Sequence, residues 1–560
     1  MGRSHSSLIS VFRSRTAVSA AGAVAAAMVL GMSSPPSVAR TSMHRGVASR
    51  PAVQMGPAQV NLNCAWPVET TPTTSNIAAP DPFATYWTTP FLASPGNSIT
   101  ISGSYPTSRF MSLAVYNDSY ELFTNTVDGK SVPSDLSDYQ ITADPGSSNP
   151  WRSGRVGRHA AFTVRLLPTV TAAQQQSENA IPMIDQNPPA SPAGPPGVGY
   201  VIFRTYVPAG GNTSVHLPVI TVTSGQGSTT LPPCPTQSTE SVHAASAAML
   251  TAAKRLRTAG TARTAGTART ARTAGTAEAP ELQYFGPSAA SQGGLFPNPV
   301  NAYLAMQFTP EPGYVVVTHG KAPTSPTQAG RGAPGDSIGA YPVPWIRPEF
   351  QVRYWSIANY LNAPPYPVVE NGQGSGEVFG GTADYLTTLR DGYYTVVSSL
   401  PADEPSPESL RANAATWIPT SAASPGAPEL QLLRNMLSQQ RLYPEGFTFL
   451  PPPASPSDII PPATVQQQMG AYYPQTAQCT VQTFEISGWA GCQLLSSFTA
   501  GSPERRRLPR EQRDRGREGV QVVLAADGAE FPGAGEPRDR DVAEHPGQEP
   551  GVVIGLGKHP

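Results

Sequence analysis

An eight-residue stretch that occurs twice constrains the fold of this chain more than any other feature. Residues 109–116 read RFMSLAVY and residues 353–360 read RYWSIANY, and the two align without a gap. Two shorter echoes follow in the same order, because residues 162–164 resemble 394–396 and residues 202–204 resemble 432–434. The offsets are 353 − 109 = 244, 394 − 162 = 232 and 434 − 204 = 230. Three ordered matches at a nearly constant offset predict two copies of one unit, produced by an internal duplication.

The residue pattern within each copy is typical of β-structure. Residues 98–102 alternate between polar and apolar side chains, which predicts a strand with one buried face. Residues 109–116 carry uncharged side chains on both faces after Arg109, which predicts a central strand covered on both sides. Residues 301–308 fit either a short helix or a strand. Since the first copy lacks helical periodicity, the sequence predicts an all-β fold of two tandem, jelly-roll-like β-sandwich domains.

The first 39 residues have the pattern of a signal peptide. Arg3, Arg13 and Arg15 precede a nearly unbroken apolar run over residues 17–32, and small residues follow at 37–39. We therefore expect a secreted protein, extracellular or in the cell wall, with no stable membrane span after cleavage. The alternative is tethering to the membrane by an uncleaved signal anchor.

Changes in composition divide the rest of the chain. We expect a disordered lead-in at 40–60, a first domain at 61–235, an Ala/Thr/Arg/Gly repeat linker at 236–280, a second domain at 281–492 and a disordered charged tail at 493–560. The tail resembles the translation of a shifted reading frame. The linker is basic but lacks aromatic residues that would stack on bases, and the net charge is only −1. A nucleic-acid partner is therefore not expected.

The four cysteines predict two disulfides. An even count in an exported protein favours pairing, and the domain boundaries select Cys64–Cys234 and Cys479–Cys492. A zinc site is the competing interpretation, but neither pair has the Cys-x-x-Cys spacing or a nearby histidine.

No catalytic motif stands in the structural context that its chemistry needs. There is no HExxH. Residues 335–339 (GDSIG) match Gly-x-Ser-x-Gly and residues 330–335 match the dinucleotide fingerprint, but the chain lacks the alternating helices of an α/β-hydrolase and a βαβ unit around the fingerprint. His319 is interpreted as a solvated histidine in an exposed turn. No bound cofactor or metal is expected, with Ca²⁺ as the one exception considered next.

Five carboxylates cluster along one half of the first domain: Asp118, Asp128, Asp135, Asp138 and Asp144. Two could flank a glycosidic bond, or several could bind Ca²⁺, and the candidates for such a site are Asp118, Asp128 and Asp144. Because Asp beside Pro, Gly, Ser and Asn is also ordinary turn composition, we favour turns.

Four arginines occupy equivalent places in the two copies: Arg109, Arg204, Arg353 and Arg434. One interpretation is an anion-binding site in each domain. The other, which we favour, is a structural clamp in which each buried guanidinium meets a carboxylate or a carbonyl. Eight aromatic residues could stack on sugars, although core packing is their default role: Tyr105, Tyr116, Trp151, Tyr206, Trp345, Tyr354, Trp355 and Trp417.

Several motifs resemble those of secreted actinobacterial proteins of unknown function that have two related β-sandwich halves. The resemblance is carried by residues 105–116, 144–150 and 202–208 in the first half, and by 298–304, 320–324, 352–356, 391–394 and 472–474 in the second. Each half also resembles the C-terminal β-sandwich domain of unknown function found in bacterial two-domain envelope proteins. The resemblance implies a fold and an extracellular address, and it carries no catalytic residue to this chain.

These observations predict a secreted, non-catalytic protein that binds an extracellular or cell-envelope ligand, such as a cell-wall glycan, between its two domains. The first alternative is a carbohydrate-active hydrolase or lyase that uses the first-domain carboxylates. The second is a purely structural surface protein.

Overall fold

The structure is a computed structural model that describes residues 64–153, 159–188, 197–235, 281–287, 296–326, 345, 349–363, 366–372, 378–453 and 458–500. The described residues belong to one compact unit. They are mostly β-strands in antiparallel sheets with few helices, which confirms the all-β prediction. The predicted signal peptide, lead-in, linker and fingerprint match lie outside the described residues, as does the tail beyond Ala500.

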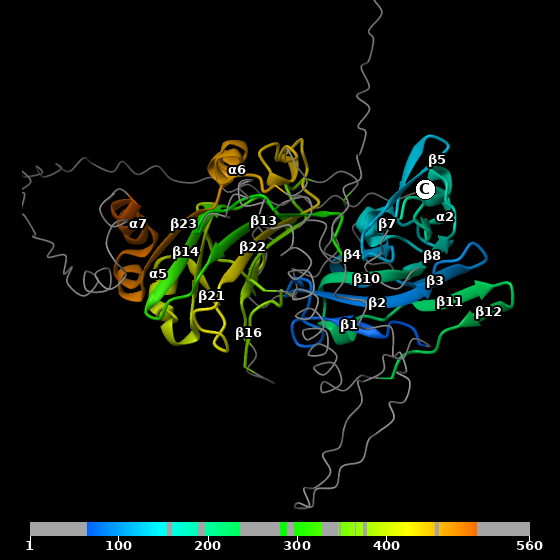
Figure 1. The fold of residues 1–560 in the computed structure, drawn as a ribbon, viewed down its shortest axis with the longest axis horizontal. Helices are drawn as coiled ribbons and strands as arrows, with labels where there is room; N and C mark the ends of the chain where they lie inside the picture. The colour runs from blue at the N-terminus through cyan, green and yellow to red at the C-terminus, as the bar shows by residue number, and fades with distance from the viewer. Residues whose placement is uncertain are drawn as a thin grey trace, which may run out of the picture. The chain divides into compact units, whose positions relative to one another are not determined.

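The first half of the chain forms two five-stranded sheets, labelled in Figure 1. The first sheet has the order β1 (Val68–Thr70), β2 (Ala84–Leu92), β10 (Val198–Pro208), β4 (Ser108–Tyr116), β7 (Asp135–Ser137). The second has the order β12 (Gly227–Thr230), β11 (Val219–Ser224), β3 (Ser98–Ser104), β8 (Ala161–Leu167), β9 (Ala180–Pro182). A separate hairpin joins β5 (Thr124–Val127) to β6 (Lys130–Pro133).

The second half also forms two main sheets. The first has the order β13 (Asn301–Phe308), β22 (Glu429–Met436), β15 (Tyr354–Leu361), β18 (Gly381–Ala383). The second has the order β19 (Leu389–Arg390), β20 (Tyr393–Ser399), β14 (Tyr314–Lys321), β23 (Gln475–Thr480), and β21 (Ala415–Pro419) also pairs with β20. A small hairpin pairs β16 (Glu370–Asn371) with β17 (Val378–Phe379). Residues 301–308, ambiguous in sequence, are therefore a strand.

The strand orders of the two halves correspond. The order β2-β10-β4-β7 matches β13-β22-β15-β18, and β11-β3-β8-β9 matches β23-β14-β20-β21. In both halves the last pair, β8 with β9 and β20 with β21, is parallel. The register agrees too, because Arg204 lies opposite Ser112 and Arg434 opposite Ser356. The duplication remains an inference, and this correspondence is the observation that supports it.

Short helices and 3-10 turns connect the strands. They are η2 (Asp138–Gln140), α1 (Pro150–Ser153), α2 (Ala172–Glu178), η3 (Asn212–Ser214), η7 (Pro401–Asp403), α5 (Pro407–Ala412), η8 (Phe447–Phe449), α6 (Pro462–Met469) and η9 (Gly470–Tyr472). The helix α2, which precedes the parallel strand β9, illustrates how the sequence defines such a connection. Thr171 caps its first turn by accepting a hydrogen bond from the Gln174 backbone, and Asn179 ends it with φ of 50°.

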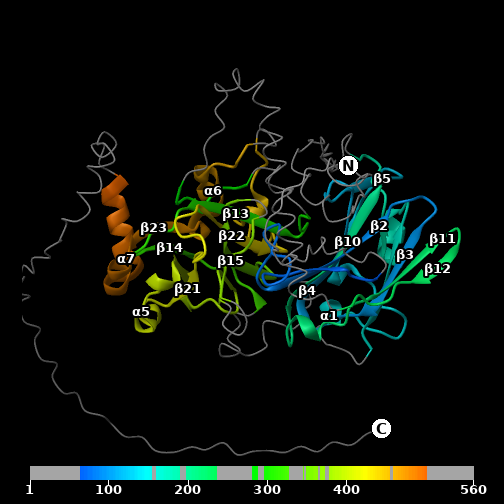
Figure 2. The ribbon, with the colours of Figure 1, turned by 60° about the horizontal axis from the view of Figure 1, so that its bottom comes forward.

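The last helical element, α7 (Val481–Ala500), was not expected from the sequence, and it consists of two helical segments joined by a kink at Gly488, whose φ is 58°. It lies against β23 and β14, as Figure 2 shows, and covers the outer face of their sheet with Phe484 and Cys492. The helix continues past Cys492, so the predicted start of the tail at residue 493 is wrong. Two glycines and a run of small residues hide its helical pattern, and the interior position of Phe484 depends on the sheet beneath it.

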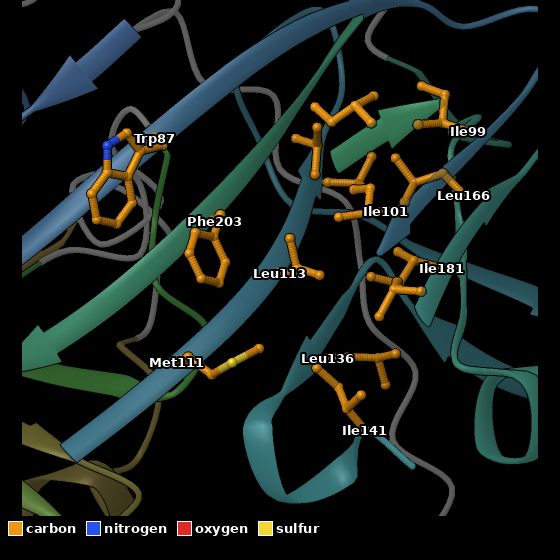
Figure 3. Close-up of a cluster of buried hydrophobic side chains, with 14 of the residues drawn as sticks. Trp87, Ile99, Ile101, Met111, Leu113, Leu136, Ile141, Leu166, Ile181 and Phe203 are labelled. Atoms are coloured by element: carbon orange, nitrogen blue, oxygen red, sulfur yellow. The ribbon is translucent and has the colours of Figure 1, made fainter. Parts of the chain in front are cut away.

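Each sandwich has its own apolar core. In the first, side chains from facing sheets interdigitate, among them Ile101 of β3, Leu113 of β4 and Phe203 of β10 (Figure 3). Every residue of β4 is buried, as expected for a central strand. Its Leu113 face belongs to this core, whereas Phe110 on its other face joins a cluster that includes Tyr354 of the second half.

Both predicted disulfides are confirmed. Cys64 pairs with Cys234 across 170 residues, and Cys479 pairs with Cys492 across 13 residues. No free cysteine remains. In the chain-entropy account, the long link stabilises the fold by about 5 kcal/mol and the short one by about 3 kcal/mol. Within the described part of the chain, no helix is long and apolar enough to span a bilayer.

Candidate functional site

Two buried ion pairs connect the halves in a reciprocal way. Arg109 of the first half donates from Nη1 to Asp384 Oδ2 of the second at 2.9 Å, and also to the Arg353 carbonyl at 3.0 Å. Arg353 of the second half in turn donates from Nη1 to both oxygens of Asp138 of the first, each at 2.6 Å. Its guanidinium also lies 4.6 Å from the Trp345 ring centroid. Both side chains of each ion pair are 0% exposed.

The second pair of arginines follows the same pattern with carbonyl partners. Arg204 Nη2 donates to the Phe296 carbonyl at 3.0 Å, and Arg434 Nη2 donates to the Ala79 carbonyl at 2.7 Å. Each guanidinium also lies near the rings of two tyrosines, Tyr86 and Tyr116 for Arg204, and Tyr303 and Tyr360 for Arg434. The carbonyl partners again come from the other half: Phe296 lies just before β13 of the second half, and Ala79 lies between β1 and β2 of the first. The tyrosines belong to the same half as the arginine that they contact.

Burial decides between the two interpretations of these arginines. All four residues are at most 2% exposed, so an anion from solvent does not reach them without rearrangement. They form the structural clamp, but between the two halves and not within each core. Burial raises the pKa of Asp138 and the Arg353 guanidinium partly offsets that rise, which is the balance of desolvation against attraction expected for a buried pair.

Sequence reasoning did not identify Asp138 and Asp384 as the partners of Arg353 and Arg109. A repeat in the sequence could have pointed to them. Asp138-Tyr139 and Asp384-Tyr385 each follow the edge strand of their sheet by one residue. They form a further echo, at an offset of 384 − 138 = 246. Similarly, residues 79–83 read APDPF and residues 296–300 read FPNPV, at an offset of 296 − 79 = 217. These two repeats contain partners of the arginines: Asp138 and Asp384 in the first, and Ala79 and Phe296 in the second.

The three candidate carboxylates lie in separate turns. Asp118 follows β4 and accepts a hydrogen bond from the Gly197 backbone at 3.3 Å, whereas Asp144 accepts one from Thr163 Oγ1 at 3.0 Å. Asp128 is exposed in the β5–β6 turn, where its φ of 52° beside Gly129 is that of a tight hairpin. No described hydrogen bond or ion pair joins any two of the three. In the described part of the chain, no cluster of His, Cys, Asp or Glu is arranged to hold a metal ion.

His319 does not lie in an exposed turn, so that prediction is wrong. It is a half-buried residue of β14, with its ring stacked between Tyr393 and Trp489 at 5.5 and 5.2 Å. Its Nδ1 lies 3.0 Å from Thr395 Oγ1. Burial lowers the pKa of His319 from its usual 6.5. Strand β14 continues through Gly320-Lys321, where it pairs with β20. Helix α7, which the sequence did not reveal, supplies Trp489, whose ring covers the histidine.

The aromatic residues proposed for sugar stacking are mostly in the interior. Seven of the eight are buried, and Trp417 is partly buried. Tyr105 and Trp151 pack edge to face in the first core, and Trp355 packs against Tyr394 in the second. A glycan needs exposed rings, so these residues do not provide a platform for one.

An apolar pocket opens into the first sandwich. Its volume is about 310 Å³. Strands β2, β10 and β11 supply most of its lining, and the rest comes from β3, the residue before it and the residue after β12: Thr89, Pro90, Phe91, Leu92, Asn97, Ile99, Val198, Val201, Ile220, Val222 and Leu231. The lining contains no titratable side chain. Its two polar side chains already have partners, because Thr89 Oγ1 accepts from the Trp66 backbone and Asn97 Nδ2 donates to the Leu92 carbonyl.

A close backbone approach shapes this pocket. The Phe91 ring lies directly over Gly199 of β10, so that a Cβ added at Gly199 would be 2.5 Å from the ring. Leu92, beside it at the end of β2, is 62% exposed. The apolar lining of this pocket suits an uncharged apolar group.

Comparisons with known proteins add similarity in structure only. No protein-family model matches the chain, and no curated protein matches it. Among solved structures, an uncharacterised protein from Burkholderia cenocepacia is similar at 12% identity and a TM-score of 0.37, covering 73% of this chain and 79% of that one. The VPA0106 protein from Vibrio parahaemolyticus is similar at 10% identity and a TM-score of 0.30, covering 65% of this chain and 87% of that one. These scores are too low to transfer a fold or a function.

Proposed function

We propose that this protein is an exported, non-catalytic binding protein that takes the aliphatic chain of an extracellular or cell-envelope lipid into the pocket of its first sandwich. The observation that carries the proposal is the apolar pocket without a titratable lining residue. Export is supported by the signal-like first 39 residues and by the two disulfides, which persist in oxidising compartments.

The volume of the pocket sets the size of the ligand. A protein cavity of about 150 Å³ lined by apolar side chains holds one benzene molecule. At about 310 Å³, the present pocket has room for roughly twice that, on the order of ten to twelve carbon atoms. A polar head group would stay at the mouth, since the lining offers no free hydrogen-bonding side chain. A glycan between the halves is less well supported, because the arginines and most aromatic residues there are buried.

Displacement of a fluorescent probe tests the proposal. The full-length, disulfide-intact protein is stripped of bound lipid, loaded with N-phenyl-1-naphthylamine and titrated with straight-chain alcohols of increasing length. Each added methylene that enters the pocket should contribute about 0.8 kcal/mol, or roughly a fourfold gain in affinity. The gain should stop once the chain exceeds about twelve carbons, because the pocket is then full.

A pair of neighbouring substitutions locates the binding. Val222→Phe places a ring in the pocket and should weaken alcohol binding at least tenfold. Thr221→Phe makes a comparable change on the other face of β11, where Thr221 Oγ1 meets Thr230 Oγ1 at 3.0 Å, and should leave binding unchanged. Absence of saturable displacement, or equal losses in the two folded variants, would contradict the proposed function.

A further inference from the structure

The two halves carry different side chains at the place of the apolar pocket. Strands β10 and β22 align at the offset of 434 − 204 = 230 that relates their arginines. Val201, which lines the pocket, therefore corresponds to Gln431. Gly199, which lies beneath the Phe91 ring, corresponds to Glu429. This apolar wall of the first half thus has a polar counterpart in the second.

The neighbouring strands show the same contrast. Strands β3 and β14 align because their partners β8 and β20 carry one of the repeated stretches. In that alignment Ile220 of β11 corresponds to Thr476 of β23. Val222 corresponds in the same way to Gln478. Three apolar lining residues of the pocket, on β10 and β11, are therefore polar in the second half.

A buried hydrogen-bond network occupies this place in the second half. Gln431 is fully buried, and its Oε1 accepts from Tyr284 OH at 2.5 Å and from Thr318 Oγ1 at 2.8 Å. Its Nε2 donates to Asn359 Oδ1 at 2.8 Å and to Ser398 Oγ at 3.0 Å. The amide therefore uses both of its N–H groups and both lone pairs of its oxygen. An aliphatic chain inserted here would break these bonds and leave buried polar groups unpaired, which is costly.

The carboxyl of Glu429 occupies the corner that the Phe91 ring shapes in the first half. Glu429 is fully buried, and its Oε1 accepts from the Ser421 backbone at 2.7 Å. It lies opposite Phe308 on the neighbouring strand, as Gly199 lies opposite Phe91. A ring can lie directly over the strand at Gly199 because that residue has no Cβ. The second half, with a glutamate there, does not form the same corner.

We propose that these substitutions confine binding to the first half, so that each molecule takes up one aliphatic chain. Val201 and its apolar neighbours on β11 admit the chain, and Gln431 with its partners excludes it from the second half. The inference rests on the proposed function, and it adds the stoichiometry and the residues that set it. The two halves thus have different roles, one as the binding unit and the other as its support.

Calorimetric titration of the full-length, disulfide-intact protein with 1-decanol, after bound lipid has been stripped, measures the stoichiometry. We expect one decanol per molecule. Val222→Phe should weaken binding about tenfold or more, because the added ring overfills the pocket. Gln478→Phe is the matched control, since it places the same ring at the corresponding position of the second half. This variant should still bind one decanol with the affinity of the wild type.

A pair of Val→Thr variants tests whether polarity, and not size, sets the selectivity. Val201→Thr keeps the branched shape of the side chain but places a hydroxyl in the pocket wall, and it should weaken decanol binding about fivefold or more. Val164→Thr makes the same change in the first core outside the pocket lining and should leave the affinity unchanged. Circular dichroism checks that both variants fold.

The outcomes separate this inference from the proposed function. Two decanols bound per wild-type molecule, loss of binding in folded Gln478→Phe, or unchanged affinity in folded Val201→Thr would each overturn the inference and leave a lipid-binding protein. A wild-type protein that binds no decanol would overturn both. The wild-type stoichiometry decides the question even if a variant does not fold.

Discussion

Breaking the buried Arg109–Asp384 ion pair should lower the free energy of unfolding far more than breaking an exposed arginine–carboxylate pair does. Both side chains are 0% exposed, and Nη1 lies 2.9 Å from Oδ2. Replacing Arg109 by Met leaves the Asp384 carboxylate buried without its counter-charge, and the expected cost is about 3–5 kcal/mol in the free energy of unfolding. Replacing both residues, in Arg109→Met/Asp384→Leu, removes the uncompensated charge and should recover most of that loss.

An exposed pair in the same half serves as the control. Arg165 and Glu178 make an ion pair at 3.1 Å with side chains 48% and 42% exposed. Because water screens this pair, Arg165→Met should cost about 0–1 kcal/mol. Both variants replace arginine by methionine, so the difference between their losses in the free energy of unfolding measures the effect of burial.

Urea-induced unfolding, followed by tryptophan fluorescence at neutral pH with the disulfides intact, gives the free energies of unfolding of Arg109→Met, Asp384→Leu, the double variant, Arg165→Met and the wild type. The four values of the Arg109–Asp384 cycle separate the pairwise interaction from the cost of each replacement. Equal destabilisation by Arg109→Met and Arg165→Met would refute the assignment of Arg109 to a buried clamp. A double variant less stable than Arg109→Met would show that the lost packing, and not the unpaired charge, is the main cost.

Three further outcomes follow from single features of the fold. Burial raises the pKa of Glu429 to about 8, so the folded protein keeps a proton that the unfolded chain releases above about pH 4.3. Stability should therefore fall between about pH 5 and pH 8, and Glu429→Gln should flatten this part of the curve in urea unfolding. Replacing both Cys64 and Cys234 by Ala should lower the free energy of unfolding by about 5 kcal/mol, measured against the oxidised wild type; a loss under about 1 kcal/mol would contradict the entropic account. Gly199→Ala should push the Phe91 ring, 2.5 Å from the added methyl, towards the pocket and weaken alcohol binding at least tenfold, with circular dichroism as the check on folding.

The sequence by itself determined the β-rich character of the chain and the pairing of its cysteines, and it predicted the internal duplication that the matching strand orders support. These follow from local patterns: alternation gives strands, and the repeat of Arg109 at Arg353 aligns them. It also identified Asp128-Gly129 as a turn, since that dipeptide accepts positive φ with little strain.

Only the tertiary structure decided which residues meet across the chain. The sequence cannot reveal that Arg109 reaches Asp384 rather than a carboxylate of its own half, because that choice depends on contacts between residues 275 positions apart in the chain. His319 looked solvated because the helix that covers it lies far along the chain, and the apolar pocket is made of residues whose alternation predicts only a core. Periodicity fixes the face on which a side chain lies, whereas its partner and its exposure depend on packing between elements distant in sequence.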